Sequence, residues 1–228
     1  MQYNETLNKH FTAAQLRAWL AAGEVVAASG DRRFADDAET PDIVSPAGPL
    51  KAAAVLVLVV NHPAPTIVFT QRTAHLTDHA GQISFPGGRV EAQDVDAAAT
   101  ARREAVEETG IRADQIEIVG TLPQYTTGTG YLITPVVAWA EAPLHYSPDA
   151  HEVAEVFEVP ARFLLNPRNH RFEKAMYKGR MREYYAIPYD NRYIWGATAG
   201  MLITFSRVVG HAEGWEKHPP VIKASDSA

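Results

Sequence analysis

The sequence predicts a mixed α/β fold, in which a mixed sheet lies between helices, and three stretches support this. Residues 52–60 are a near-continuous aliphatic run, which is typical of a strand buried on both faces. Residues 95–109 have a helical pattern that ends at Gly110, and residues 197–209 have a second one rich in apolar side chains. With 228 residues, 46% of them hydrophobic, the chain is long enough for one well-packed domain.

The other elements follow in order from local patterns. Thr12 is a candidate N-cap for a helix that runs to about Ala22, with Leu16, Trp19 and Leu20 as its apolar stripe. Strands are expected at 66–71, 116–121, 132–140 and 153–159, a short helix at 162–165, and an antiparallel pair at 171–177 and 183–188. We therefore divide the chain into an N-terminal helix (1–28), a connecting arm (29–50), a main domain (51–215) and a disordered tail (216–228).

Composition excludes several classes of function. A net charge of -6 is the opposite of what a phosphate backbone attracts, so we expect no nucleic-acid partner. The chain has no Cys, which excludes disulfides, thiolate catalysis and Cys-ligated zinc. Its start lacks the pattern of a signal peptide, and its longest aliphatic run is too short to span a bilayer. We expect a cytoplasmic protein without a membrane partner.

Three carboxylates on one helical turn are the main chemical signal. The helix predicted at 95–109 has acids at positions i, i+3 and i+4, namely Glu104, Glu107 and Glu108, so these three side chains share one of its faces. Like charges this close repel one another unless a cation lies among them, and Mg²⁺ or Mn²⁺ is the natural partner for oxygen ligands. A solvated acidic face is the simpler explanation. The preceding residues 84–88, with their paired glycines, and Arg103 beside the first acid favour the metal site.

This segment resembles the Nudix box, which reads Gly, five residues, Glu, seven residues, Arg-Glu, an aliphatic, any residue, Glu-Glu, any residue, Gly and an aliphatic. Residues 103–111 fit its second half, with Ala105 in the aliphatic position. Asp94 stands where the first Glu belongs, and eight residues separate it from Arg103. The resemblance implies a Nudix-type α/β/α sandwich with a mixed sheet between helices, and a metal-dependent hydrolase.

The residues before the box narrow the resemblance. Residues 68–88 are similar to the motif of the coenzyme A pyrophosphatase branch, which also carries the longer box with Asp. Further similar stretches are 125–137, 152–160 and 194–199. One difference is Thr77, which stands where the branch usually has Arg. The resemblance implies cleavage of coenzyme A to 3′,5′-ADP and 4′-phosphopantetheine.

The spacing of the acids predicts their catalytic roles. Glu104 and Glu108 are expected to be the principal metal ligands, because side chains at i and i+4 project most nearly in parallel, and Glu107 is expected to bind directly or through water. Arg103 is expected to hydrogen-bond the glutamates and fix their rotamers. The general base is either Glu104 or a glutamate from a later loop, for which Glu152 is the candidate; Glu152 also fits an ordinary solvated acid at a strand edge.

Four residues are candidate substrate-binding groups. Arg72 can hold a phosphate through two hydrogen bonds, although a salt bridge at a sheet edge is an alternative. His79 is a candidate for contact with the 3′-phosphate or for proton transfer, and a purely structural histidine is the alternative. Gly87 and Gly88 allow the main chain to approach the metal or a phosphate, and a plain tight turn fits them equally well.

Two alternative functions stay open. Another Nudix activity would act on ADP-ribose, dinucleoside polyphosphates or nucleoside triphosphates. A nucleotide or coenzyme A sensor without catalysis is the other alternative, and the intact acids argue against it. The oligomeric state stays open, and a homodimer is one assembly in which the aromatic residues Tyr193 and Trp195 near the final helix could serve as an interface.

Overall fold

The computed structural model describes residues 11–22, 29–31, 48–74, 81–177, 180–212 and 222–223. Within these residues the main sheet has nine strands: β1 (Ser29–Gly30), β2 (Lys51–Asn61), β3 (Thr66–Arg72), β4 (Ile83–Ser84), β5 (Gly87–Arg89), β6 (Glu117–Thr121), β7 (Tyr125–Thr126), β8 (Tyr131–Glu141) and β9 (Val153–Pro160). A second sheet contains β10 (Arg171–Tyr177), β11 (Arg180–Tyr189), β12 (Arg192–Trp195) and β13 (Ile222–Lys223). The α-helices are α2 (Ala13–Ala22), α3 (Ala97–Thr109), α4 (Ala161–Leu164) and α5 (Gly196–Ala212). Two short 3₁₀ helices span Ala113–Gln115 and Pro167–Asn169.

Strand β2 is the centre of the main sheet and is buried on both faces, as its aliphatic sequence predicts. It pairs in parallel with the whole of β8, while β3 and β5 share its other edge in antiparallel pairing. Leu56 and Leu58 belong to the core that includes residues of α3, whereas Val57 and Val59 belong to the core that includes residues of α5. Because successive side chains of a strand point to opposite faces, this one strand contributes to both cores.

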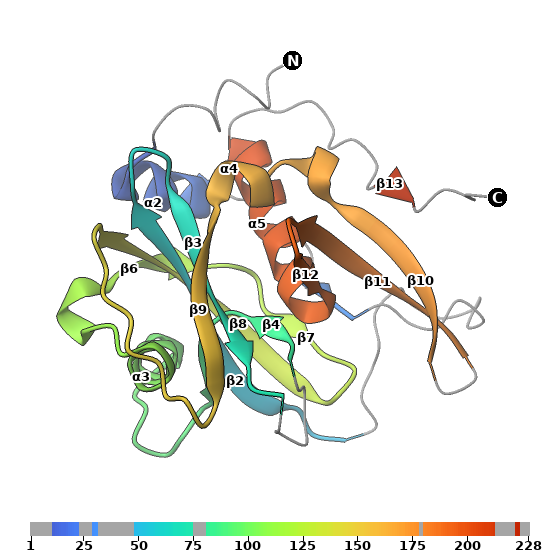
Figure 1. Ribbon diagram of the computed structural model, residues 1–228, viewed down its shortest axis with the longest axis horizontal. Helices are drawn as coiled ribbons and strands as arrows, with labels where there is room; N and C mark the ends of the chain where they lie inside the picture. The colour runs from blue at the N-terminus through green and yellow to red at the C-terminus, as the bar shows by residue number, and fades with distance from the viewer. Residues whose placement is uncertain are drawn as a thin grey trace.

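Figure 1 shows the layers that result. Helix α3 covers one face of the main sheet, and α5 lies on the other side, between the main sheet and strands β10–β12. Helix α2 packs against α5 and β6. The structure therefore has the mixed sheet between helices that the sequence predicts, with a further antiparallel sheet behind α5. In the described part of the chain, no helix is long and apolar enough to cross a membrane.

Most helix boundaries agree with the sequence-based expectations. Thr12 caps α2, since its hydroxyl accepts a hydrogen bond from the Gln15 amide and its own amide donates one to the side-chain oxygen of Gln15. Helix α3 starts at Ala97, two residues later than expected, because the Asp96 side chain accepts from the Ala99 amide and acts as the N-cap.

Two segments differ in kind from what the sequence suggested. The paired glycines at 87 and 88, expected as a loop, form strand β5 with the central strand. Inside the expected tail at 216–228, the structure describes only residues 222–223, which pair with β10. The main part of the expected arm at 29–50 lies outside the described residues.

Candidate active site at the acidic helix

Strand β5 brings two glycines against the central strand and helix α3. Gly87 and Gly88 stand opposite Val55 and Ala54 of β2. A Cβ on Gly87 would lie 2.5 Å from the carbonyl oxygen of Ala54, and a Cβ on Gly88 would lie 2.3 Å from Oε1 of Glu104. Both glycines therefore allow a close approach, of main chain to main chain at 87 and of main chain to carboxylate at 88. Neither is a plain tight turn.

Glu104 and Glu108 lie on the side of α3 that faces β5. Glu108 is only 6% exposed, and its Oε2 accepts one long hydrogen bond of 3.3 Å from the Gly87 amide. Burial, helped by the charge of Glu104, raises the pKa of Glu108 to about 8, against the opposing effects of the Gly87 amide and the charge of Arg72. Burial also raises the pKa of Glu104. The helix thus holds two carboxylates on one side, and the charge of Glu108 in particular has little compensation.

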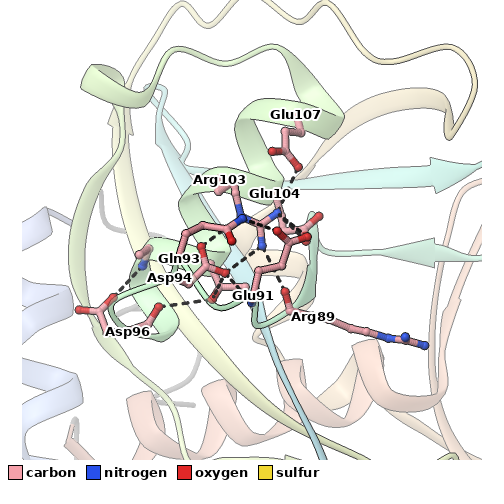
Figure 2. A network of polar contacts seen from close by, with 10 residues as sticks. Arg89, Glu91, Gln93, Asp94, Asp96, Arg103, Glu104 and Glu107 are labelled. Carbon is pink, nitrogen blue, oxygen red and sulfur yellow. Dashed lines mark hydrogen bonds and ion pairs between the residues drawn. The ribbon is translucent and has the colours of Figure 1, made fainter.

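Arg103 is fixed by a carboxylate at the start of the same helix (Figure 2). Its Nε and Nη2 donate to Oδ1 and Oδ2 of Asp94 at 3.1 and 2.9 Å. Its Nη1 donates to Oε1 of Glu104 at 3.0 Å, and its Nη2 also donates to the carbonyl oxygen of Arg89 at 3.2 Å. The guanidinium therefore connects the N-terminal end of α3, the end of β5 and the Glu104 carboxylate, as the expected positioning role requires.

Asp94 is a site residue that the sequence analysis left without a role. Besides Arg103, it accepts hydrogen bonds from the Glu91 amide and the Thr100 hydroxyl, both at 2.9 Å. The hydrogen bonds from Arg103, followed by that from the Glu91 amide, hold the pKa of Asp94 well below its usual range. Its place as an acid ahead of Arg103 was the available signal, and the irregular spacing of the box obscured it.

Glu107 is separated from the other two acids. Its side chain is 58% exposed, and its Oε2 accepts from Arg103 Nη1 at 3.2 Å as an i, i+4 pair along the helix. Figure 2 shows Glu107 further along the helix than Glu104, on the outer side of the guanidinium. Its role as a third metal ligand stays a prediction.

The segment before β9 brings Glu152 toward the buried acid. The Asp149 amide donates to the Glu108 carbonyl oxygen, and the Glu152 amide donates in turn to the Asp149 carbonyl oxygen. The Glu152 carbonyl oxygen accepts from the Thr73 amide at the end of β3. Glu152 is close enough for its charge to contribute to the raised pKa of Glu108. The side chain is exposed, so it is open to a ligand.

Arg72 ends strand β3 on the same side of the molecule. Its charge acts on Glu108, and its Nε is buried without a hydrogen-bond partner among the described residues. A buried donor of this kind is costly unless something binds it, and no salt bridge of Arg72 is formed with the described acids. His79 lies outside the described residues, as does Thr77.

The carboxylate oxygens of these acids are suitable ligands for a divalent cation, although the acids do not form a complete coordination shell. Among the described residues, no group of three or more His, Cys, Asp or Glu side chains is arranged to hold a metal ion. Glu104 and Glu108 nevertheless offer hard oxygen donors in a buried place where their charges oppose each other, and Mg²⁺ often takes only one or two carboxylates, with substrate phosphates completing its shell. Glu104 and Glu108 are thus the residues that would hold the ion.

The fold and this site define a mixed α/β protein with an acidic helix packed against a glycine strand at the sheet. The family model for the NUDIX domain matches residues 50–178. The uncharacterized Nudix hydrolase NudL of Citrobacter koseri is 37% identical over 160 residues, which are 70% of this chain and 83% of NudL. NudL of Escherichia coli K12 matches with the same identity and coverage. The chain therefore belongs to the Nudix family and is a Nudix hydrolase.

Solved structures also match about half of the chain. The Nudix hydrolase RenU of M. smegmatis is 27% identical and covers 50% of this chain and 73% of its own, with a TM-score of 0.43. A binary complex of the C. elegans Ap4A hydrolase is 21% identical and covers 48% of this chain and 80% of its own, with a TM-score of 0.42.

Proposed function

We propose that this Nudix hydrolase cleaves coenzyme A, with Mg²⁺ or Mn²⁺, to 3′,5′-ADP and 4′-phosphopantetheine. The structural observation that supports a diphosphate substrate is the buried Glu108, whose charge has little compensation, next to Glu104 and close to Arg72. The Nε of Arg72 has no hydrogen-bond partner among the described residues. The choice of coenzyme A is supported by the motif at 68–88 and by the longer box with Asp94.

The reaction is attack of water on one phosphorus of the diphosphate. The new P–O bond forms to water, and the bridging P–O bond breaks, so that the bridging oxygen leaves with the other phosphate. The bound cation supplies neutralisation of the diphosphate charge and activation of water. Glu152, exposed and near Glu108, is our proposed acceptor of the proton that water loses, and Glu104 is the alternative.

The remaining residues hold the reacting groups in place. Arg72 donates hydrogen bonds to oxygens of the diphosphate, which supply the partner that its buried Nε lacks. Arg103 keeps the Glu104 carboxylate in one rotamer, since the guanidinium is itself held by Asp94 on two sides. Gly88 leaves the space into which the Glu104 carboxylate fits.

Product identification tests the proposal directly. The purified chain is incubated with Mg²⁺ or Mn²⁺ and, separately, with coenzyme A, ADP-ribose, a dinucleoside polyphosphate and a nucleoside triphosphate, and products are identified by mass spectrometry. We expect 3′,5′-ADP and 4′-phosphopantetheine from coenzyme A. Faster cleavage of another member of the panel would reject coenzyme A as the substrate, and tight binding without any product would indicate a sensor.

A set of variants tests the assignment of residues. Glu104→Gln should abolish cleavage, and Glu152→Gln should lower kcat while leaving KM close to its original value. Glu117→Gln is the matched control, because Glu117 is an exposed acid that pairs with Arg17 away from the site. An unchanged kcat in Glu152→Gln would assign the proton to Glu104 instead.

A further inference from the structure

Two cations and a tyrosine gather at one end of the main sheet, on the face opposite to the acids. Lys51 starts β2, Tyr131 starts β8 directly beside it, and Arg89 ends β5 opposite Ala53. In β2, the odd-numbered residues such as Val57 face the core of α5. Lys51 and its neighbours across the strands share that face, because paired residues point to the same side of a sheet. We call Lys51, Arg89 and Tyr131 the cationic platform.

The tyrosine holds the two cations together. Arg89 donates from Nε and Nη2 to the Tyr131 hydroxyl at 3.0 and 2.5 Å, and its guanidinium carbon lies 5.4 Å from the centre of the ring. The Lys51 ammonium nitrogen lies 5.8 Å from the same ring. Such contacts with a ring partly offset the repulsion between two positive charges, but they supply no negative charge.

Neither cation has an acid to neutralise it within the described residues. The chain is acidic, and some of its arginines have an acidic partner: Arg17 pairs with Glu117, and Arg192 pairs with Glu155. Lys51 and Arg89, by contrast, are exposed, and no described carboxylate lies within salt-bridge distance of either. Two cations that share one tyrosine ring and lack a described acidic partner create a positive surface that favours binding of an anion.

The platform is joined to the active site through one short strand. Gly88 abuts the Glu104 carboxylate, and Arg89 is the next residue, with its carbonyl oxygen bound by Arg103. Figure 2 shows the Arg89 side chain extending away from the acids, while its backbone stays within the network. Gly88 and Arg89 are adjacent residues of one strand, so the backbone that carries Arg89 is fixed relative to the acids. Among the described strands β5 pairs only with β2, and at its other edge the Gly87 amide and the Arg89 carbonyl oxygen bond to side chains of α3.

We propose that Lys51 and Arg89 bind a phosphomonoester on the nucleotide half of the substrate, separate from the diphosphate that is cleaved. A phosphomonoester carries close to two negative charges at neutral pH, which matches two cations, and its oxygens accept the hydrogen bonds of a guanidinium. Tyr131 is a positioning residue that holds Arg89. The inference rests on the proposed function, because coenzyme A has such a group, its 3′-phosphate, and it makes this group the basis of specificity.

The test compares coenzyme A with dephospho-coenzyme A, which has the same diphosphate but lacks the 3′-phosphate. We expect the wild type to prefer coenzyme A, and Lys51→Gln/Arg89→Gln to lose about tenfold or more in kcat/KM for coenzyme A while keeping its rate on dephospho-coenzyme A. Tyr131→Phe, which keeps the ring but removes the hydroxyl, should lower the preference less. The control is Arg17→Gln/Arg112→Gln, which removes two charges from exposed pairs elsewhere and should leave the preference unchanged.

Two outcomes separate the failure of this inference from the failure of the proposed function. Equal losses on both substrates, or no loss on either, would overturn the phosphate site while leaving coenzyme A hydrolysis in place. If neither substrate is cleaved, calorimetry decides: 3′,5′-ADP should bind the wild type more tightly than 5′-AMP, and the Lys51→Gln/Arg89→Gln variant should bind both alike. Equal binding of both to the wild type, or inorganic phosphate competing as well as 3′,5′-ADP, would reject the site.

Discussion

Asp94 and Glu108 are both buried carboxylates of the same helical motif, but their surroundings are opposite. The Asp94 side chain is 4% exposed and accepts hydrogen bonds from a guanidinium, a backbone amide and a hydroxyl, and its pKa is lowered. Glu108 is 6% exposed, has one long hydrogen bond from an amide, and its pKa is raised to about 8. The same chemical group is therefore satisfied at one end of the motif and unsatisfied at the other.

This difference separates structure from function within one motif. Buried polar groups are normally fully hydrogen-bonded, and a group that is not so bonded indicates a site kept for something else. Asp94 holds Arg103, and Arg103 holds Glu104, so the hydrogen-bonded acid has a structural role. We call Asp94 and Arg103, together with strand β5 against which α3 packs, the frame of the site. Glu108 sits in that frame without compensation, which is the condition under which a divalent cation would be bound.

Replacing Glu108 should have the largest effect on activity, and it should change activity and stability in opposite directions. Glu108→Gln should lower kcat/KM by about a thousandfold or more, because a metal ion contributes several kcal/mol to charge stabilisation. The same change should stabilise the metal-free protein near neutral pH by on the order of 1 kcal/mol, since the raised pKa of Glu108 means that folding must protonate this carboxyl, a cost that a neutral amide does not have. Activity assays and thermal unfolding in chelator check both parts. A large loss of stability would show that Glu108 belongs to the frame.

Substitutions at the two glycines of β5 should likewise separate an effect on stability from an effect on activity. A Cβ at Gly87 would collide with the backbone of Ala54 and Val55, so Gly87→Ala should cost about 3 kcal/mol of unfolding free energy. A Cβ at Gly88 would instead meet the flexible end of Glu104, which can move. Gly88→Ala should therefore keep most of the stability and lose about a hundredfold in activity through misplacement of the carboxylate.

Urea unfolding and steady-state kinetics on the same two preparations measure this contrast. Each variant is the control for the other, since both add one methyl group to adjacent residues of one strand. Similar losses of stability in both variants would mean that the space beside Glu104 is part of the packing and has no special link to catalysis.

The sequence predicted the frame of the fold better than the details of the site. The aliphatic run at 52–60 and the stop at Gly110 depend on local patterns, and the structure confirms both. The sharing of one helical face by Glu104 and Glu108 also follows from helical periodicity. The role of Asp94 did not follow, because its partner Arg103 lies nine residues away and the pairing depends on how the intervening turn folds.

Contacts between segments that are distant in the sequence could not be predicted from it for the same reason. The approach of Glu152 to Glu108 depends on hydrogen bonds between the end of α3 and the segment before β9. The cationic platform depends on the register of β5, β2 and β8, and only pairing in space brings Lys51, Arg89 and Tyr131 together. Strand register is set by the whole sheet, and a local pattern does not contain it.

Removing the satisfied acid should weaken the frame with a smaller effect on activity. Asp94→Asn keeps the shape of the side chain but removes the charge that holds Arg103, so the urea midpoint should fall, and activity should drop about tenfold because Glu104 loses its orientation. The effect should depend on pH in a known direction. The pKa of Asp94 is lower in the folded protein than in the unfolded chain, so its contribution is present above about pH 4 and is lost as the pH falls further.

Unfolding in chelator at several pH values between about 3 and 7 measures that dependence. The difference in stability between wild type and Asp94→Asn should be constant near neutral pH and should shrink toward pH 3. A difference that stays the same over the whole range would show that packing, and not charge, makes Asp94 important.

Glu107 should give the smallest effect, because it belongs neither to the frame nor to the buried pair. It is exposed and pairs with Arg103 along the helix, so Glu107→Gln should change unfolding free energy by less than about 0.5 kcal/mol. If it binds the metal through water, kcat/KM should fall about tenfold at most, far less than in Glu108→Gln. Glu91→Gln is the control, since Glu91 is an exposed acid facing the same guanidinium at 3.9 Å. A loss as large as that of Glu108→Gln, with a matching loss of metal affinity in calorimetry, would instead make Glu107 a direct ligand and would mean that its side chain turns inward when the metal binds.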